Sequence, residues 1–405
     1  MSTRAQTESF APPAVVGDWQ RRALFVGAVF AVASIIGLII DVEQFFRAYL
    51  LGFLYVLGLG LGSLAVLMIY HATGGAWGTV LRRMLEAASR TLWAVAIAFV
   101  PIIIGIHHLY PWSHAEESAH NEHLQRIGPL YLNPGLFIVR AVVYFALWIG
   151  LAWWLNRQSE RQDREAVVLD RPFRGVGCVG LVIYGFSLTF AAMDWAMSLD
   201  PEWFSTIWGL LFMAGHGLIT WSMAVIVLSR LVLRPPMREV VEPEQFHDYG
   251  KLLLACTMLW GWFTLSQWLI IWSGNLPEEI SWYLNRTRGG WREVAYFVVI
   301  GQFFIPFFLL LSRSLKRDHK RLMKVAAWIM FMRYWDLYWY VMPNFENRQG
   351  HFRYSWLDAV VPIALVALWF ALFFSYLRRR PLLAVYDDHV KLLLEQGHEI
   401  EHERA

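Results

Sequence analysis

The chain has 405 residues, of which 57% are hydrophobic and only 17% are charged, and its mean hydropathy is +0.40. A soluble domain carries about 25% charged residues, so this composition excludes an ordinary soluble protein. The net charge of +3 needs no nucleic acid as partner, and two cysteines cannot supply the four ligands of an iron–sulfur cluster. The sequence contains no C-x-x-C-H haem-attachment motif. Any metal centres used in electron transfer would therefore belong to partner subunits.

Apolar runs of about 20 residues, the length that crosses a bilayer as a helix, recur along the chain. Strands are excluded because an open sheet edge cannot face lipid. We predict an all-α membrane protein of about ten transmembrane helices, arranged as two four-helix bundles plus two peripheral helices. The expected spans are residues 23–40, 48–70, 91–109, 134–155, 175–193, 204–229, 252–272, 294–312, 323–341 and 356–377.

The ten spans form a membrane domain over residues 23–377, between an N-terminal segment (1–22) and a C-terminal tail (378–405) that is expected to form a short amphipathic helix. Most of the 35 Lys and Arg residues lie at the two ends of the chain and in alternate connections. Because basic loops stay in the cytoplasm, both termini are expected there, in a bacterial inner (plasma) membrane. The first apolar run lacks a convincing cleavage site and is expected to be retained.

Two long loops are expected on the outer side, at residues 110–133 and 273–293. The first is rich in histidine and glutamate: His114, Glu116, Glu117, His120, Glu122 and His123. Such a cluster could bind a metal, but a solvated loop that faces a partner is the favoured interpretation. We therefore assign no metal site.

A short internal repeat relates the second to fifth spans (about 48–193) to the sixth to ninth (about 204–341). Each half has an arginine at the outer start of one helix with a tyrosine one turn further in, and an aspartate at the outer end of the next. The matching residues are Arg140 with Arg292, Tyr144 with Tyr296 and Asp194 with Asp336. Units four spans apart share one topology, which predicts a parallel repeat about an axis along the membrane normal.

Ionisable residues inside a bilayer are costly and are functional candidates by default. The candidates for a proton relay or for catalysis in a quinone pocket are Asp194, His216, Asp336 and Asp358. The candidates for the lining of such a pocket are His107, His108, Gln267, Arg333 and Tyr184. A quinol headgroup needs a hydrogen bond at each oxygen and a base for its protons. The polar stripe of the fifth span, which ends at Asp194, would suit a proton relay.

Structural roles remain open for several of these residues. Arg333 and Asp336 have the i, i+3 spacing of an ion pair on one helix. His216 alone on an apolar helix could be a packed, hydrogen-bonded residue. The glycines Gly58-x-Gly60-x-Gly62 are expected to serve helix packing. The functional hypothesis therefore requires the candidate side chains to meet near the outer face.

The stretch from Asp194 to Thr206 reads Asp-Trp-Ala-Met-Ser-Leu-Asp-Pro-Glu-Trp-Phe-Ser-Thr. Together with ten spans in two four-helix bundles and acidic residues at outer helix ends, it resembles the NrfD/PsrC-type integral membrane subunits. Within that family, the chain is most similar to ActC and ActF, the membrane subunits of alternative complex III, and its length is nearer to ActF. The resemblance covers nearly the whole chain.

The resemblance implies a membrane subunit of a quinol:cytochrome c oxidoreductase, either with a quinone site or without catalysis of its own. It implies a pocket facing the periplasm for menaquinone or ubiquinone, a proton translocation path and no covalently bound cofactor. The implied partners are an ActC-like membrane subunit, an iron–sulfur subunit and c-type cytochrome subunits, which hold the clusters and haem c. Two other hypotheses stay open: a b-haem anchor, which needs two facing histidines, and a secondary transporter.

Overall fold

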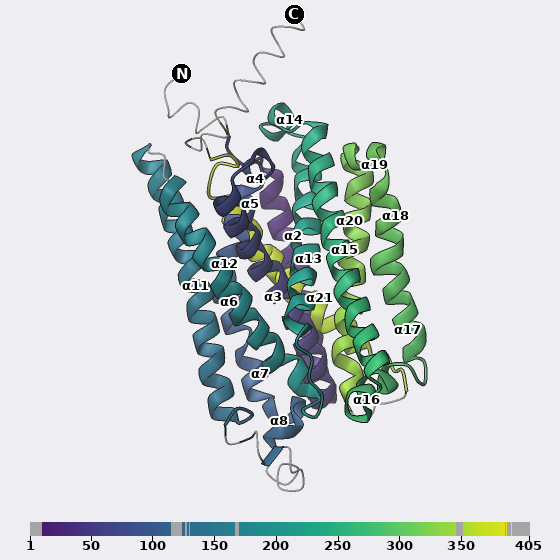
Figure 1. Cartoon of the computed structure of the whole chain (residues 1–405). Helices are drawn as coiled ribbons and strands as arrows, with labels where there is room; N and C mark the ends of the chain where they lie inside the picture. Colours follow the sequence, from purple (N-terminus) through teal and green to yellow (C-terminus); the bar gives the residue numbers. More distant parts are fainter. Residues whose placement is uncertain are drawn as a thin grey trace, which may run out of the picture.

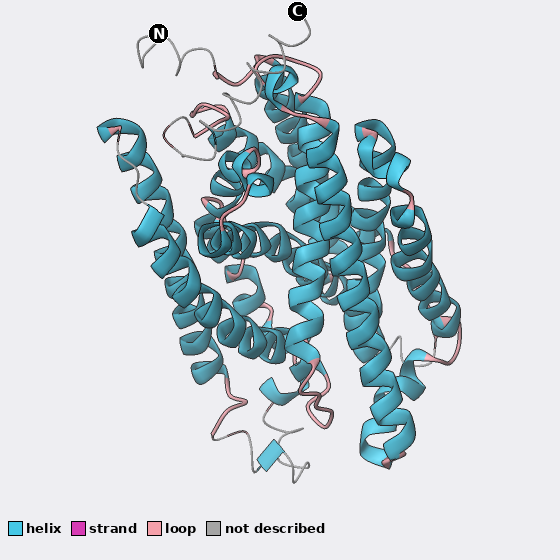
Figure 2. Cartoon of the chain, turned by 45° about the horizontal axis from the view of Figure 1, so that its top comes forward, coloured by secondary structure: helices cyan, strands magenta, loops and turns pink. Residues whose placement is uncertain are grey.

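The computed structural model (Figure 1) describes residues 10–114, 124–125, 128, 130–166, 170–345, 351–384, 386 and 390. Within these ranges the chain forms helices and connections and no strand, which confirms the all-α prediction (Figure 2). Nine helical segments of this described part are long and apolar enough to cross a membrane. They are Val15–Ile40, Val42–Thr73, Arg82–Ile104, Pro134–Glu165, Arg171–Leu199, Trp208–Leu231, Pro243–Gly274, Trp291–Leu311 and Trp356–Leu377. The chain is therefore a multi-pass membrane protein.

A further helix, α20 (His319–Val341), is as long as the other spans but carries more charge. Basic residues open it, and Arg333 and Asp336 lie near its other end. With α20, the described part of the chain has about ten long helices, as the sequence predicts.

Several helices extend beyond the apolar runs that identify them. Helix α2 (Val15–Ile40) begins at Val15 rather than near residue 23, and its first turns contain an Asp18–Arg21 ion pair of 2.6 Å. The other long helices are α3 (Val42–Thr73), α11 (Pro134–Glu165), α12 (Asp170–Trp195), α13 (Trp208–Leu231), α15 (Pro243–Gly274) and α21 (Trp356–Leu377). Hydropathy marks the depth of the hydrocarbon, whereas polar residues can continue a helix into water.

The third span is broken into short helices instead of forming one rod. These are α5 (Arg82–Ser89), α6 (Leu92–Ile97), α7 (Val100–Ile104) and α8 (Ile106–Leu109). Pro101 lacks the N–H that an unbroken helix would use. At Gly105 the ring of Phe46 lies so close that an added Cβ would be 2.2 Å from it. The break therefore follows from local backbone chemistry and close packing on α3.

The eighth span is also irregular. It runs through α17 (Trp291–Val298), a π-helical turn η3 (Val299–Phe304) and α18 (Ile305–Leu311). Pro306 cannot donate a hydrogen bond to the carbonyl one turn before it, which favours local rewinding. Such π turns occur often at functional sites.

The helices pack in two sets joined along α3 and α13. One set contains α3, α5 to α8, α11 and α12, and the other contains α13, α15, α17, α18 and α20. Helices α2 and α21 pair with each other and lie against α3 (Figure 1). Gly58 and Gly62 bring α3 close to His216 and Thr220 of α13, because an added Cβ would meet those side chains. The glycines thus serve helix packing, as predicted.

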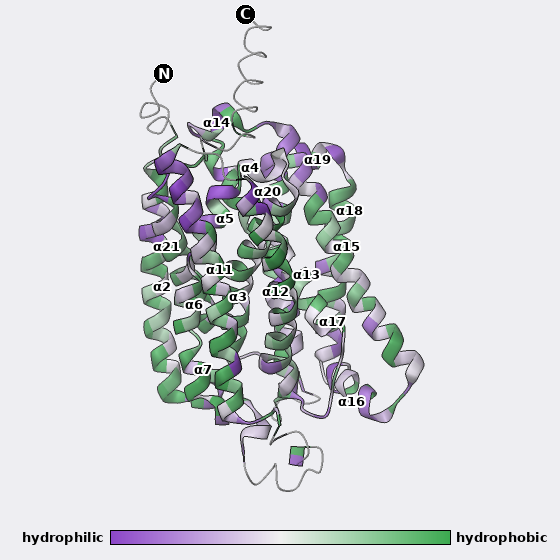
Figure 3. Cartoon of the chain, turned by 60° about the vertical axis from the view of Figure 1, so that its left-hand side comes forward, coloured by the Kyte–Doolittle hydropathy of each residue, from purple (hydrophilic) through white to green (hydrophobic). Residues whose placement is uncertain are grey.

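The first and last described segments meet at one end of the bundle, which we call the terminal end. The rings of Trp19 and Phe374 lie 5.6 Å apart, and the N–H of Leu382 donates to the carbonyl of Phe10 over 2.9 Å. The short helices α4 (Ala76–Thr79), α14 (Met237–Val240) and α19 (Arg313–Arg317) lie at this same end (Figure 1). Hydrophilic residues gather there, while the long helices are mainly hydrophobic along their length (Figure 3).

Candidate functional site

The four residues predicted as relay or pocket groups are all buried. Asp194, Asp336 and Asp358 are 0% exposed, and His216 is 2% exposed. The hydrogen bonds of each residue run to a different set of side chains. The structure therefore contains four local arrangements, and not the single meeting point that the functional hypothesis required. They differ in how completely their polar atoms are paired.

Asp194, at the end of α12, has both carboxylate oxygens paired. Arg140 of α11 donates to them from Nε over 2.9 Å and from a terminal nitrogen over 3.0 Å. The Tyr144 hydroxyl adds a third bond of 2.9 Å. Arg140 also donates to the carbonyl of Tyr131 and lies 3.9 Å from the centre of its ring. Arg140 and Asp194 thus form a bidentate ion pair that joins α11 and α12 and leaves neither carboxylate oxygen without a hydrogen bond.

Asp358 acts as a capping residue at the start of α21. It accepts from the backbone N–H of Ser355 over 2.9 Å, and the Ser355 side chain completes a capping box. Gln44 of α3 and Tyr338 of α20 donate to the same carboxylate over 2.5 and 3.2 Å. Asp358 thus ties α21 to two other helices.

His216 lies in the interface between the two helix sets. Its Nδ1 is 3.3 Å from the hydroxyl of Tyr184 on α12, the predicted lining residue. Its Nε2 makes no hydrogen bond within the described part of the chain. The arrangement suits a packed interfacial histidine on the side of α13 that faces α3.

The remaining lining candidates are dispersed. His107 and His108 are exposed; His107 lies 3.1 Å from the Ser113 hydroxyl, and His108 stacks on Phe46. Gln267 is buried on α15 and accepts from Ser205 over 3.3 Å.

Asp336 forms the predicted ion pair with Arg333 on its own helix. Both side chains are buried, and the indole N–H of Trp260 on α15 donates to the same carboxylate oxygen over 3.1 Å. Arg333 lies against the backbone of α13 at Gly215, where an added Cβ would be 2.2 Å from the guanidinium carbon. The other carboxylate oxygen, Oδ1, makes no hydrogen bond within the described residues.

A cavity of about 760 Å³ lies beside this under-paired carboxylate. Asp336 is part of its wall, together with Trp260, Thr264, Trp339 and Tyr340. The walls come from α15, α16 (Pro277–Arg286), α17, η3 and α20. The volume lies within the range of small-molecule pockets, about 300–1,000 Å³. Of the nine predicted site residues, Asp336 alone is among those that line it.

Several polar atoms on the cavity wall are buried and unpaired within the described part of the chain. They are Asp336 Oδ1, the hydroxyls of Tyr340 and Thr264, and the indole N–H of Trp339. Tyr340 lies beside both Asp336 and Thr264, although none of the three makes a hydrogen bond of standard geometry with another. Unpaired buried polar atoms are costly, so this group is a candidate for contacts with a polar ligand or with water.

The rim of the cavity faces the lipid side of α15 and α17. Trp268, Tyr296 and Phe304 line it and are 45%, 60% and 44% exposed. A ligand dissolved in the bilayer could therefore enter between these helices without crossing water. Arg292 also lines the cavity, and its side chain is 61% exposed and paired with Glu293.

Arg286 at the end of α16 holds the segment that carries Trp339 and Tyr340. Its guanidinium donates to the carbonyls of both residues, over 3.2 and 2.9 Å, and to the Asn344 side chain over 2.6 Å. Burial lowers the pKa of Arg286, and the negative charge of Asp200 opposes that shift. A cation at the carbonyl end of α20 also complements the helix dipole. The cavity wall is thus fixed by a buried cation rather than by a loop.

Within the described residues, no group of three or more His, Cys, Asp or Glu side chains could hold a metal ion. The His/Glu cluster predicted after the third span lies outside them, except for His114. The C-terminal amphipathic helix is likewise mostly outside the described ranges. In comparisons with known proteins, no family model matches the chain, and no curated protein is similar to it in sequence.

Sequence reasoning missed two features of these sites. The sequence predicts Arg140 as a member of a repeat and Asp194 as a member of the repeat and of a proton relay, but it does not predict that the two are partners. Trp260, Thr264 and Tyr340 were not predicted as pocket residues, although Trp260 and Thr264 are four residues apart and share one face of α15. That spacing, facing the aspartate-bearing helix, was the available signal.

Proposed function

We propose that this chain is the integral membrane subunit of a quinol:electron-acceptor oxidoreductase complex and that the cavity beside Asp336 receives the quinone headgroup. One observation carries the proposal: Asp336, whose buried Oδ1 makes no hydrogen bond within the described residues, lines an aromatic cavity that opens at the exposed faces of α15 and α17. The resemblance to the alternative complex III subunits points to the same class of protein.

The cavity wall offers the chemistry that a quinol headgroup requires. Asp336 Oδ1 accepts a hydrogen bond from one quinol hydroxyl, and the hydroxyls of Tyr340 and Thr264 serve the second oxygen. Aromatic side chains such as Trp260 and Trp339 pack against the faces of the ring. The isoprenoid tail leaves through the rim at Trp268 and Tyr296. Asp336 Oδ1 and the two hydroxyls, which make no hydrogen bond within the described residues, thus gain partners from the ligand.

Oxidation of the quinol releases two protons and two electrons. Asp336 accepts a proton in its role as base, and Arg333 holds the carboxylate in place. The second proton passes to water at the periplasmic face, and iron–sulfur clusters of the partner subunit that the resemblance implies would take up the two electrons. The saturated ion pair at Asp194 serves as structure in this scheme. Orientation follows the basic residues, with the terminal end in the cytoplasm and the Asp336 end toward the periplasm.

The test measures binding of a photoreactive azido-quinone to the purified full-length protein in lipid nanodiscs. Tyr340→Phe and Thr264→Val remove hydroxyls that make no hydrogen bond of standard geometry within the described residues, and each should lower labelling several-fold. Asp336→Asn should lower it most, while Asp194→Asn, at a site away from the cavity, should leave it unchanged. Peptide mapping should place the label on α15 or α17.

Equal labelling of all four variants, or a label on α11 and α12, would remove the cavity from the proposal. Membership of a complex is tested separately by mild-detergent purification. Iron–sulfur and haem-containing subunits should co-purify, whereas a transporter would be isolated alone and a b-haem anchor would show its own Soret band.

A further inference from the structure

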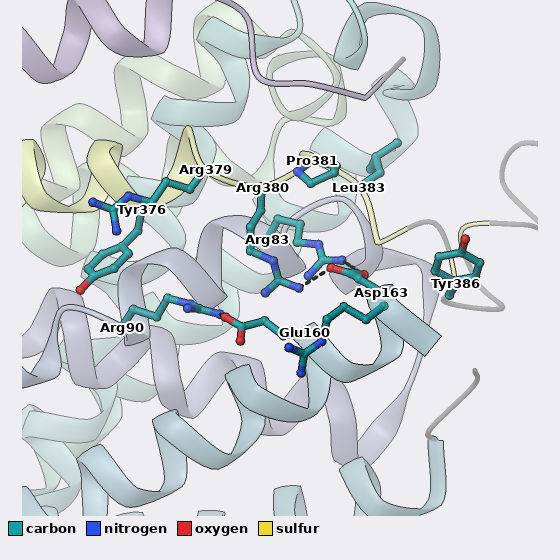
Figure 4. Close-up of a pocket in the computed structure, with 11 residues that line it drawn as sticks. Arg83, Arg90, Glu160, Asp163, Tyr376, Arg379, Arg380, Pro381, Leu383 and Tyr386 are labelled. Carbon is teal, nitrogen blue, oxygen red and sulfur yellow. Dashed lines mark hydrogen bonds and ion pairs between the residues drawn. The ribbon is translucent and has the colours of Figure 1, made fainter. Parts of the chain in front are cut away.

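Two further cavities lie at the terminal end of the first helix set and share no lining residue with the Asp336 cavity. One has a volume of about 500 Å³ and is lined by arginines of α5, α11 and the segment after α21. The other, of about 620 Å³, lies between α6 and α11. Arg90, Glu160, Arg164 and Tyr376 line both, so the two cavities are adjacent. Figure 4 shows the first cavity, with Arg90 beside Glu160.

A buried polar network, which we call the floor, adjoins the first cavity through Arg83, Asp163 and Arg380. Glu86, 2% exposed, accepts from Arg83 over 2.8 Å, from Ser159 over 2.7 Å and from Arg380 over 3.1 Å. Asp163 pairs with the same two arginines (Figure 4). These bonds join α5, α11 and the chain after α21 at one point. The hydrogen bonds and ion pairs of this network therefore hold in place the helices and the segment that carry the arginines of the first cavity.

Three more arginines surround the two cavities without a carboxylate partner among the described residues. Arg157 lies 4.9 Å from the ring of Trp153, Arg379 lies 5.4 Å from the ring of Tyr376, and Arg164 is exposed on α11. The neighbouring acids are already engaged: Glu160 pairs with Arg90, and Asp163 pairs with arginines of the floor. Among the described residues, the site thus carries a local excess of positive charge.

The second cavity continues from the arginines into an apolar groove. Leu92 and Trp93 of α6 form one side, and Ile149, Ala152 and Trp153 of α11 form the other. Trp93 and Trp153 are 45% and 57% exposed, and the Trp93 indole donates to the Tyr376 hydroxyl over 2.8 Å. Indole side chains of this kind mark the boundary between headgroups and acyl chains.

We infer that this site binds one phospholipid with an anionic headgroup. The phosphate lies among Arg157, Arg164 and Arg379, and an acyl chain follows the groove between α6 and α11. Basic pockets between transmembrane helices bind anionic lipids on the cytoplasmic side, where basic residues collect. Arginines without a carboxylate partner among the described residues lie next to an apolar groove. This combination fits a lipid, which has a charged headgroup and an acyl chain, better than a free anion, which would contact the arginines alone. The lipid covers the broken third span on its outer face.

The test compares lipid retention by native mass spectrometry of the full-length protein from mixed micelles of phosphatidylglycerol and phosphatidylcholine. The variant Arg157→Gln/Arg164→Gln/Arg379→Gln should lose about tenfold or more of the preference for phosphatidylglycerol, because each arginine near an anionic surface contributes several-fold. The matched control, Arg234→Gln/Arg238→Gln/Arg313→Gln, removes three exposed arginines from the same end of the other helix set. It should retain the wild-type preference.

Two further measurements distinguish a bound lipid from a small anion and from nonspecific attraction by charge. Trp153→Ala, in the exposed wall of the groove, should weaken retention of long-chain phosphatidylglycerol while leaving any binding of inorganic phosphate unchanged. Complete displacement of the lipid by millimolar inorganic phosphate would overturn the proposal in favour of a small-anion site. An equal loss of preference in the site variant and the control would overturn it in favour of nonspecific charge. Gel filtration and far-UV circular dichroism verify that each variant is folded.

Discussion

Asp194 and Asp336 occupy matching positions in the two halves of the chain, but their surroundings differ. At Asp194 both carboxylate oxygens are paired with Arg140 and Tyr144. At Asp336 one oxygen is paired, the other makes no hydrogen bond within the described residues, and the residue lines a cavity. The repeated aspartate thus has both oxygens hydrogen-bonded in the first half, which we call the closed site. In the second half it has one oxygen hydrogen-bonded within the described residues and lies beside a cavity, which we call the open site.

The difference arises from where the neutralising arginine comes from. In the first half Arg140 reaches Asp194 from the neighbouring helix, and Tyr144 accompanies it. In the second half the counterpart Arg292 points to Glu293 at the surface, and the cation is Arg333, on the same helix as Asp336. A repeated scaffold can thus hold a structural site and a binding site with few changes.

The largest expected effect tests whether the Asp194 pair is structural. Arg140→Ala leaves a buried carboxylate without its cation and should lower the free energy of unfolding by about 3–5 kcal/mol. Far-UV circular dichroism during SDS titration of the purified protein measures this loss.

The matched control for Arg140→Ala is the same change at its counterpart, Arg292. That arginine is exposed and paired only with a neighbouring surface glutamate, so Arg292→Ala should cost no more than about 1 kcal/mol. If the two variants lost equal stability, the proposed contrast between a closed and an open site would be wrong.

The next effect concerns the pair on α20. Arg333→Ala should lower the free energy of unfolding by about 2–3 kcal/mol, because a buried charged acceptor loses its main donor. The loss should be smaller than for Arg140→Ala, since the cavity lets water or a proton reach Asp336. Adding Asp336→Asn to Arg333→Ala should restore part of the loss. An unchanged melting temperature in Arg333→Ala would mean that the pair contributes nothing to stability.

Much of the fold follows from the sequence because hydrocarbon imposes simple rules. The length of each apolar run predicts a helix, and the i, i+3 spacing of Arg333 and Asp336 predicts a pair that the structure contains. Helix ends were predicted less well, as at Val15 and Pro243, because polar turns extend a helix outside the apolar run. The breaks near Pro101 were not predicted at all.

The candidate site was harder to predict because it depends on contacts between helices. The Arg140–Asp194 bond joins residues from two helices, and no spacing rule along one helix reveals it. The cavity beside Asp336 depends on how Trp260, Thr264 and Tyr340 pack, which a single sequence does not specify. Burial of the aspartates was predictable from their cost in lipid. Which of them stays under-paired was not.

The smallest effect uses the tyrosines that accompany the two arginines. Tyr144→Phe removes a 2.9 Å hydrogen bond to Asp194 and should lower the free energy of unfolding by about 1 kcal/mol. Its counterpart Tyr296 is 60% exposed at the rim of the cavity, so Tyr296→Phe should change stability by less than about 0.5 kcal/mol. Both variants are measured by the same SDS titration. If Tyr296→Phe lowered the free energy of unfolding as much as Tyr144→Phe, the Tyr296 hydroxyl would also make a stabilising hydrogen bond. The cavity would then be a packing feature rather than a binding site.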